Sequence, residues 1–242
     1  MVCKKRTEIP KKMKYEVRKA AYFGCVRCGC PIIHHHHIVP WHIVEKHEIE
    51  NLVALCPTCH TKIHAGSYTN EKLLEDIRNP FNKRHGKIID NFYLNKLADI
   101  TLILGGSSFS NIEDVITVSG QRLVYFNVDD QGRALLNAWF YDIKGNLVAR
   151  VVDNEWITFL RPEIWDVVYT GGKLSINSKE NSVFLELETK GSTLVINANM
   201  YYRGCTIKAD SEKIILDTPT MKGIEFRNMN ITGCKSGIVI GE

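Results

Sequence analysis

The sequence predicts an α+β protein with two parts, a histidine- and cysteine-rich module of mixed structure and an all-β domain after it. All nine histidines lie at or before His85, and four of the eight cysteines form two Cys-x-x-Cys pairs in the same region. From residue 90 onward, short runs rich in β-branched and aromatic residues alternate with turns. We therefore expect a first domain at 1–78, a linker at 79–89 and a second domain at 90–242.

The two parts differ in charge as well as in composition. Residues 1–89 hold 16 Lys and Arg against 8 Asp and Glu, whereas residues 90–242 hold 15 against 19. A positive module favours contact with nucleic-acid phosphates, and a mildly acidic domain does not. No apolar run approaches the ~20 residues of a membrane span, and no apolar stretch follows the basic N-terminus as it would in a secretory signal. We expect a cytoplasmic protein that has no membrane partner.

The two cysteine pairs predict a metal site. Cys25 and Cys28 have the spacing at which a tight turn brings two thiolates onto one zinc ion, and Cys56 and Cys59 repeat it about 30 residues later. Disulfides are the alternative, but the neighbouring histidines and the missing secretory signal favour metal binding. We expect a closed structural Zn²⁺ site that stabilises the fold. Cys30 is expected to be a bystander.

The histidines predict a second, different site. Side chains alternate faces along an extended strand, so the four histidines of the run 34–37 cannot all reach one ion. Two neighbours in the run can instead straddle a site, one binding the ion and the next activating water. His60 and His64 are four residues apart in a helix expected from Cys56 to Gly66, so they lie on one helix face and can bind one metal together.

The order of these elements resembles that of the HNH endonuclease family in its zinc-knuckle form. The matching residues read Cys-x-x-Cys, then His-His-Ile-Val-Pro, then Asn-Leu-x-x-Leu-Cys-x-x-Cys-His-x-x-x-His, within about residues 10–66. The resemblance implies a ββα-metal fold, in which a two-stranded hairpin and a helix hold one catalytic divalent ion between them.

The resemblance also implies a role for each residue of the site. His37, before Ile-Val-Pro, corresponds to the general base, and His36 to the first metal ligand, with His35 as the alternative ligand. Asn51 corresponds to the asparagine that hydrogen-bonds backbone across the loop. The remaining ligands, on the helix, are His60 and His64.

These residue types suit phosphodiester hydrolysis. A neutral imidazole, with an ordinary pKa of ~6.5, can take a proton from water. A divalent ion with open coordination positions stabilises charge on the phosphate and on the leaving oxygen. Histidine ligands suit Zn²⁺, Ni²⁺ or Mn²⁺, and Mg²⁺ with bound waters is the alternative.

Basic residues near the N-terminus predict contact with nucleic acid. A helix is expected between Pro10 and Gly24, with apolar residues on one face and Lys and Arg on the other. A solvated surface helix is the alternative reading. The residues expected to bind nucleic acid are Lys11, Lys12, Lys14, Arg18 and Arg27.

The second domain is predicted to be a sandwich, a barrel or a β-solenoid, because a turn follows about every eight to twelve residues. Its strands are expected at 115–119, 122–128, 134–141, 147–152, 165–169, 173–177, 182–187 and 193–198. It contains no histidine, no Gly-rich phosphate loop and no carboxylate cluster with metal spacing. We expect it to target or regulate the first domain, or to bind a protein, a ligand or a second copy of the chain.

The function favoured by these observations is that of a metal-dependent endonuclease that cuts DNA. One alternative is a zinc-stabilised nucleic-acid-binding module without nuclease activity, and another is an RNA nuclease. A nuclease joined to a β-rich domain fits a phage, mobile-element or defence nuclease by analogy.

Overall fold

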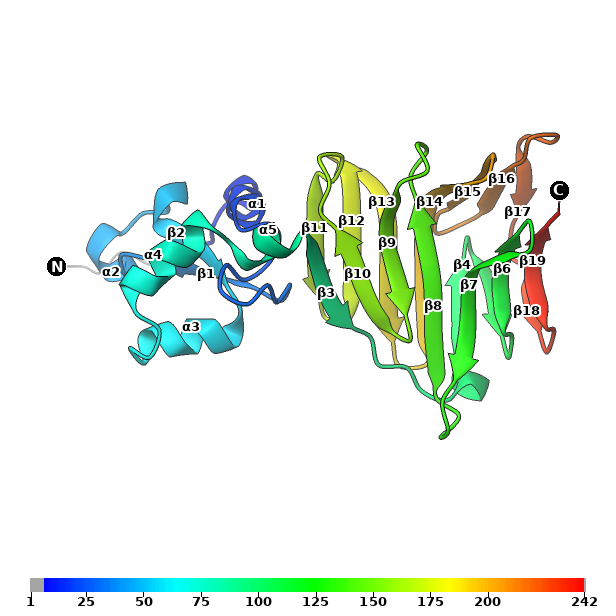
Figure 1. Ribbon diagram of the computed structural model, residues 1–242, viewed down its shortest axis with the longest axis horizontal. Coiled ribbons are helices and arrows are strands. Elements are labelled where there is room, and N and C mark those ends of the chain that lie inside the picture. Colours follow the sequence, from blue (N-terminus) through cyan, green and yellow to red (C-terminus); the bar gives the residue numbers. More distant parts are fainter. Residues whose placement is uncertain (1–6, 242) are drawn as a thin grey trace. The chain divides into compact units, whose positions relative to one another are not determined.

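The computed structural model describes residues 7–241, so the basic residues 4–6 lie outside it. The chain divides into two compact units, residues 1–89 and residues 90–242 (Figure 1). The first unit contains helices and a small sheet, and the second is built from strands. The predicted α+β class is therefore confirmed.

A two-stranded hairpin followed by a helix forms the middle of the first unit. Strand β1 (His34–His37) pairs antiparallel with β2 (Leu52–Leu55), and helix α3 (Pro57–His64) begins two residues later. A proline occupies the first helical position, where its fixed φ is suitable. The sulfur of Cys56 caps the helix by accepting a hydrogen bond from the Cys59 N–H, at 3.4 Å. This is the predicted ββα arrangement.

The remaining elements of the first unit are mostly short helices. They are α1 (Lys11–Ala20), α2 (Trp41–Val44), the 3₁₀ turn η1 (Ile49–Asn51), α4 (Asn70–Arg78) and α5 (Phe81–His85). Helix α1 is amphipathic, and it buries Val17 against the same cluster that contains β2. Three cysteines are buried in this core, alongside Leu55 and Leu73. The cysteine region is therefore part of the core of the unit.

The segment 79–89, expected to be a linker, is structured. It contains α5 and the beginning of strand β3 (Lys87–Asn91). Asn82 is 2% exposed, and its Nδ2 donates hydrogen bonds to the carbonyl oxygens of Tyr22 and Gly29, at 3.1 and 3.2 Å. A buried amide that satisfies two backbone acceptors ties α5 to the first unit.

The second unit consists of two open sheets. One has the order β19-β6-β7-β8-β9-β10-β3, and the other follows the order β11 to β17 with β4, β5 and β18 added beside it. The strands of the first are β6 (Asp114–Val118), β7 (Gln121–Val128), β8 (Ala134–Tyr141), β9 (Leu147–Val152), β10 (Glu155–Phe159) and β19 (Ser236–Ile240), with β3 at the edge. Those of the second are β4 (Thr101–Leu104), β5 (Ser107–Ser110), β11 (Asp166–Thr170), β12 (Lys173–Lys179), β13 (Ser182–Lys190), β14 (Thr193–Tyr202), β15 (Cys205–Ala209), β16 (Ile214–Asp217), β17 (Ile224–Phe226) and β18 (Asn230–Thr232).

The two sheets lie as layers (Figure 1). Apolar side chains of both sheets are buried. Burial alternates along the strands, as in β14, where Leu194, Ile196 and Ala198 are buried and the residues between them are less so. Neither sheet closes on itself, so the unit is a sandwich of open sheets and not a barrel.

One corner of the sandwich has the parallel stacking of a β-solenoid. Strand β18 pairs in parallel with β5, and β19 pairs in parallel with β6. Both pairings join residues 122 positions apart, such as Ser108 with Asn230 and Val118 with Ile240. At this corner the chain passes between the sheets in the same direction twice, from β5 to β6 and from β18 to β19, with the second passage stacked on the first.

Candidate metal centre and active site

The four cysteines of the two Cys-x-x-Cys pairs come together beside the start of α3. Their sulfur atoms all lie within 4.8 Å of one another. The Cys28 sulfur is 3.6 Å from that of Cys56 and 3.9 Å from that of Cys59. Tetrahedral zinc with Zn–S bonds of about 2.3 Å requires sulfur atoms about 3.8 Å apart. The cluster is therefore compatible with a structural zinc ion.

The protonation of the cysteine cluster also suits a cation. A hydrogen bond from the Cys28 thiol lowers the pKa of Cys25 below that of an ordinary thiol, so this sulfur ionises more readily. Burial raises the pKa of Cys59 to about 12, so its sulfur keeps a proton until a cation replaces it. Ion binding would release such protons. Cys30 stands apart, since its sulfur donates to the Ile32 carbonyl at 3.8 Å.

The histidine run alternates between two faces of β1. On one face, the His36 ring centre lies 5.0 Å from that of His60 and 5.2 Å from that of His64, both on α3. The next residue back, His35, points the other way, and its Nε2 lies 3.3 Å from the Lys14 carbonyl oxygen of α1. Of the two alternative ligands, His36 is thus the one that lies beside the histidines of the helix.

His36, His60 and His64 form a second ligand cluster. One ring nitrogen from each lies within 4.8 Å of the other two. Burial, together with the nearby His60, lowers the pKa of His36 to about 4. Its imidazole is therefore neutral at physiological pH and has a lone pair to offer. In this cluster His36 is buried, His60 is partly buried and His64 is exposed, whereas three of the four cysteines are buried and Cys28 is exposed.

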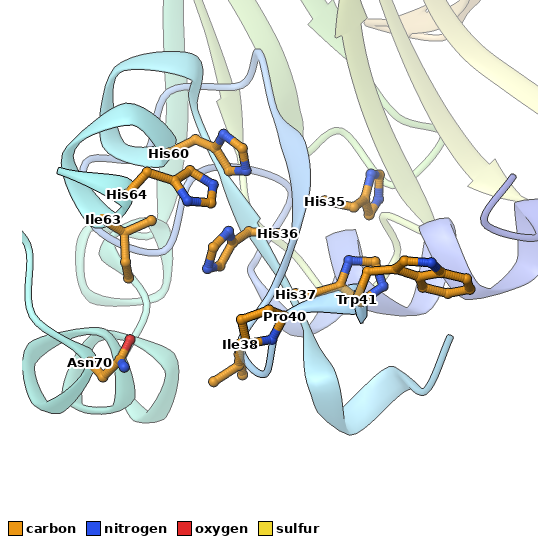
Figure 2. Close-up of a pocket in the computed structure, with 10 residues that line it drawn as sticks. All are labelled: His35, His36, His37, Ile38, Pro40, Trp41, His60, Ile63, His64 and Asn70. Atoms are coloured by element: carbon orange, nitrogen blue, oxygen red, sulfur yellow. The ribbon is translucent and has the colours of Figure 1, made fainter. Parts of the chain in front are cut away.

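The histidine cluster opens into a pocket of about 360 Å³. Figure 2 shows the rings of His36, His60 and His64 turned toward one another on one side of β1, and His37 beside Trp41 on the other side. The complete lining is His35, His36, His37, Ile38, Pro40, Trp41, His60, Ile63, His64 and Asn70. His36 and His37 thus reach the same pocket from opposite faces of one strand.

Asn51 holds the loop that follows β1. Its Oδ1 accepts a hydrogen bond from the Val39 N–H at 2.7 Å, and its Nδ2 donates one to the Val39 carbonyl at 3.0 Å. The Asn51 carbonyl also accepts the Ile38 N–H at 3.0 Å. These bonds fix the backbone directly after His37, as expected of an asparagine that crosses the loop.

His47, which belongs to no predicted motif, contacts His37. Its Nδ1 lies 3.1 Å from the His37 Nε2, and its Nε2 lies 3.0 Å from the Thr7 carbonyl oxygen. The Trp41 ring lies against it, with ring centres 4.5 Å apart. No spacing rule connects His47 with the run, because the path of the loop creates this contact.

The five basic residues predicted to contact nucleic acid differ in their exposure and in their interaction partners. The exposed residues among them are Lys11 and Lys12. Lys14 forms an ion pair with Glu8 at 2.7 Å, and the Arg27 guanidinium lies 4.3 Å from the centre of the Tyr68 ring. Arg18 is half-buried on α1. None of these five residues belongs to the lining of the pocket.

Comparison with known proteins points to the same segment. Residues 25–66 match the model of the family described as HNH endonuclease. Over 64 residues, 26% of this chain and 84% of the relative, the chain is 31% identical to Anaredoxin from Nostoc sp. (strain PCC 7120 / SAG 25.82 / UTEX 2576). No solved structure matches the chain. Among the described residues, no helix is long and apolar enough to span a membrane.

Proposed function

The chain belongs to the HNH endonuclease family through residues 25–66, and from this premise we propose that it is a metal-dependent endonuclease that hydrolyses phosphodiester bonds of DNA. Membership of this family supports a nuclease-type function in general. The observation that carries the proposal is the convergence of His36, His60 and His64 in a pocket that His37 also lines.

The three clustered histidines would hold a divalent ion. Their nitrogen atoms are close enough to share one, and a neutral His36 is ready to bind without losing a proton. Imidazole ligands suit Zn²⁺, Ni²⁺ or Mn²⁺, and Mg²⁺ would keep several waters here. When bound, the ion would stabilise negative charge on the phosphate as a Lewis acid.

His37 would act as the general base. A neutral imidazole can accept a proton from a water molecule held in the pocket, which typically contributes about 10²–10⁴-fold to the rate. Asn51 would keep this histidine in place by holding Val39, two residues further along the chain. Orientation of this kind matters because the base must lie within hydrogen-bonding distance of the water.

The charge of the first unit supports nucleic acid as the substrate. Residues 1–89 carry twice as many basic as acidic residues, and Lys11 and Lys12 extend from α1 into solvent. Such side chains bind phosphates by releasing counterions, so we expect binding to weaken as salt rises. Lys14 and Arg27 contribute less, because Glu8 and Tyr68 already engage them.

Cleavage of plasmid DNA in added Mg²⁺, Mn²⁺, Ni²⁺ or Zn²⁺, with an RNA of matched length in parallel, tests the proposal. We expect His37→Ala to lower the cleavage rate at least about 10²-fold while the protein stays folded and keeps its bound zinc. His42→Ala is the matched control, because His42 is an exposed histidine of the same loop and does not line the pocket.

Two results would contradict it. DNA binding without nicking under every metal would make the protein a zinc-stabilised binding module. Cleavage of the RNA alone would make it an RNA nuclease.

The second unit, residues 90–242, would target or regulate the nuclease, or hold a protein, a ligand or a second copy of the chain. A fragment that ends at Gly86, before β3 begins, tests this role against the full chain. We expect the fragment to cut DNA faster or with less selectivity. Equal rates, equal products and the same number of chains per particle in light scattering would contradict targeting, regulation and self-association.

A further inference from the structure

The proposed general base is held by a second histidine. His37 Nε2 and His47 Nδ1 are 3.1 Å apart, and His47 Nε2 lies 3.0 Å from the carbonyl oxygen of Thr7. Both distances are those of ordinary hydrogen bonds. The three groups therefore form a short chain that runs from the pocket wall through His47 to the backbone before α1.

The Thr7 carbonyl decides where the protons of this chain lie. A carbonyl oxygen can only accept, so the Nε2 of His47 must carry the hydrogen in that bond. In neutral His47 the other nitrogen, Nδ1, then has the lone pair and accepts a hydrogen bond. His37 must donate this bond from its Nε2, which makes Nδ1 the unprotonated nitrogen of the His37 ring.

The surroundings of His47 hold it in this position. The Trp41 ring lies 4.5 Å from the His47 ring and 5.6 Å from that of His37, so the tryptophan contacts both members of the pair. His37 itself is 7% exposed, and Asn51 fixes the loop between the two histidines. A ring held on several sides can impose one orientation on its hydrogen-bond partner.

We propose that His47 is a positioning residue for catalysis, which keeps His37 in the tautomer with an unprotonated Nδ1 and fixes the direction of its ring. The inference rests on the proposed role of His37 as general base. The proton taken from water would enter at His37 Nδ1, while Nε2 keeps its own proton in the bond to His47. His47 touches no substrate in this scheme, and it acts through His37.

Nitrogen NMR of the histidine rings in the full-length protein tests the assignment without any reaction. At a pH of about 8 an ordinary imidazole is neutral, and its two ring nitrogens differ in chemical shift according to which one carries the hydrogen. We expect wild-type His37 to show a protonated Nε2. His47→Ala should produce a mixture of tautomers at His37, whereas the control His42→Ala should leave the wild-type pattern.

Kinetics with two conservative variants separate positioning from packing. Asn at position 47 places an acceptor oxygen where Nδ1 stood, and Gln places its amide where Nε2 stood. We expect His47→Ala and His47→Gln to lower kcat by about 10²-fold or more with little change in KM, since a wrong tautomer of a catalytic histidine can cost up to about 10⁴-fold. His47→Asn should recover most of the loss.

The outcomes distinguish this inference from the proposed function. An active wild-type enzyme whose His37 tautomer does not respond to His47→Ala would overturn the positioning role alone. Equal losses in the Asn and Gln variants, with a lowered melting temperature in both, would also overturn it. A wild-type protein that cuts neither DNA nor RNA would overturn the proposed function, and the catalytic role of His47 with it.

Discussion

The two candidate ligand clusters of the first unit both use residues of helix α3, but they differ in the number, the type and the burial of their ligands. The sulfur cluster has four ligands, and Cys25, Cys56 and Cys59 are buried within the apolar core. The histidine cluster has three ligands, faces a pocket and ends at an exposed residue, His64. Four ligands close the coordination of zinc, whereas three leave a position for water or substrate. A closed coordination site stabilises the fold, whereas an open one leaves room for catalysis.

The largest effect expected from this contrast is the loss of the sulfur cluster. Cys25→Ser should remove the bound zinc and unfold the first unit, because structural zinc in small domains contributes on the order of 10–16 kcal/mol. Metal analysis and circular dichroism would measure both. Cys30→Ser is the control, since its sulfur is outside the cluster. A Cys25→Ser protein that remains folded with a full complement of zinc would break the contrast.

Removal of a histidine ligand should act on activity and leave the fold intact. His60→Ala should lower the cleavage rate at least about 10²-fold, which corresponds to about 2.7 kcal/mol in the barrier. Zinc content and melting temperature should not change, because His60 is outside the buried core. His34→Ala provides the comparison, as His34 lies 5.7 Å from His60 without belonging to the cluster. A large drop in melting temperature for His60→Ala alone would assign a structural role to this site too.

A smaller effect on both properties is expected at Asn51. Asn51→Ala leaves the Val39 N–H and carbonyl without their side-chain partners. Each such group, where it is buried, lowers the free energy of unfolding by about 1–3 kcal/mol. Urea unfolding would measure the loss of stability. Asn51→Asp retains an acceptor for the Val39 N–H and should lose less. If both variants cut DNA at the wild-type rate, the loop does not position His37.

The smallest effect is expected at a core residue, Tyr68, that belongs to neither ligand cluster. Tyr68 donates a hydrogen bond to the buried Asp76 carboxylate at 2.9 Å, and Tyr68→Phe removes it. The first unit should lose about 1–3 kcal/mol of stability, with no change in cleavage rate or zinc content. This variant tests whether a loss of stability alone lowers the measured cleavage rate. A fall in cleavage at temperatures where the variant is fully folded would mean that Tyr68 affects activity by a route other than stability.

Much of the site could be predicted from sequence because its ligands follow local spacing rules. Two residues between cysteines, and three between His60 and His64, place the side chains together whatever the rest of the chain does. The choice between His35 and His36 was harder, since it depends on which face of β1 meets α3. His47 could not be predicted, because its contact with His37 depends on the route of the loop between β1 and β2.

The same distinction holds in the second unit. The run predicted at 134–141 coincides with β8, because turn residues bound it on both sides. The parallel stacking of β18 on β5 was not predictable, since it joins residues 122 positions apart with no shared motif. Local alternation reveals strands, whereas the pairing of distant strands depends on how the two sheets pack.

Helix α3 carries Cys59 and His60 as consecutive residues, so one short element belongs to both clusters. An ion that orders helix α3 through the sulfur ligands would also order His60 and His64. The second ion would then bind with a smaller loss of conformational entropy. Thermodynamic linkage makes this reciprocal, so each ion would raise the affinity for the other by the same factor. Zinc in the sulfur cluster would then act as an allosteric activator of the proposed nuclease from outside the pocket that His36 and His37 line.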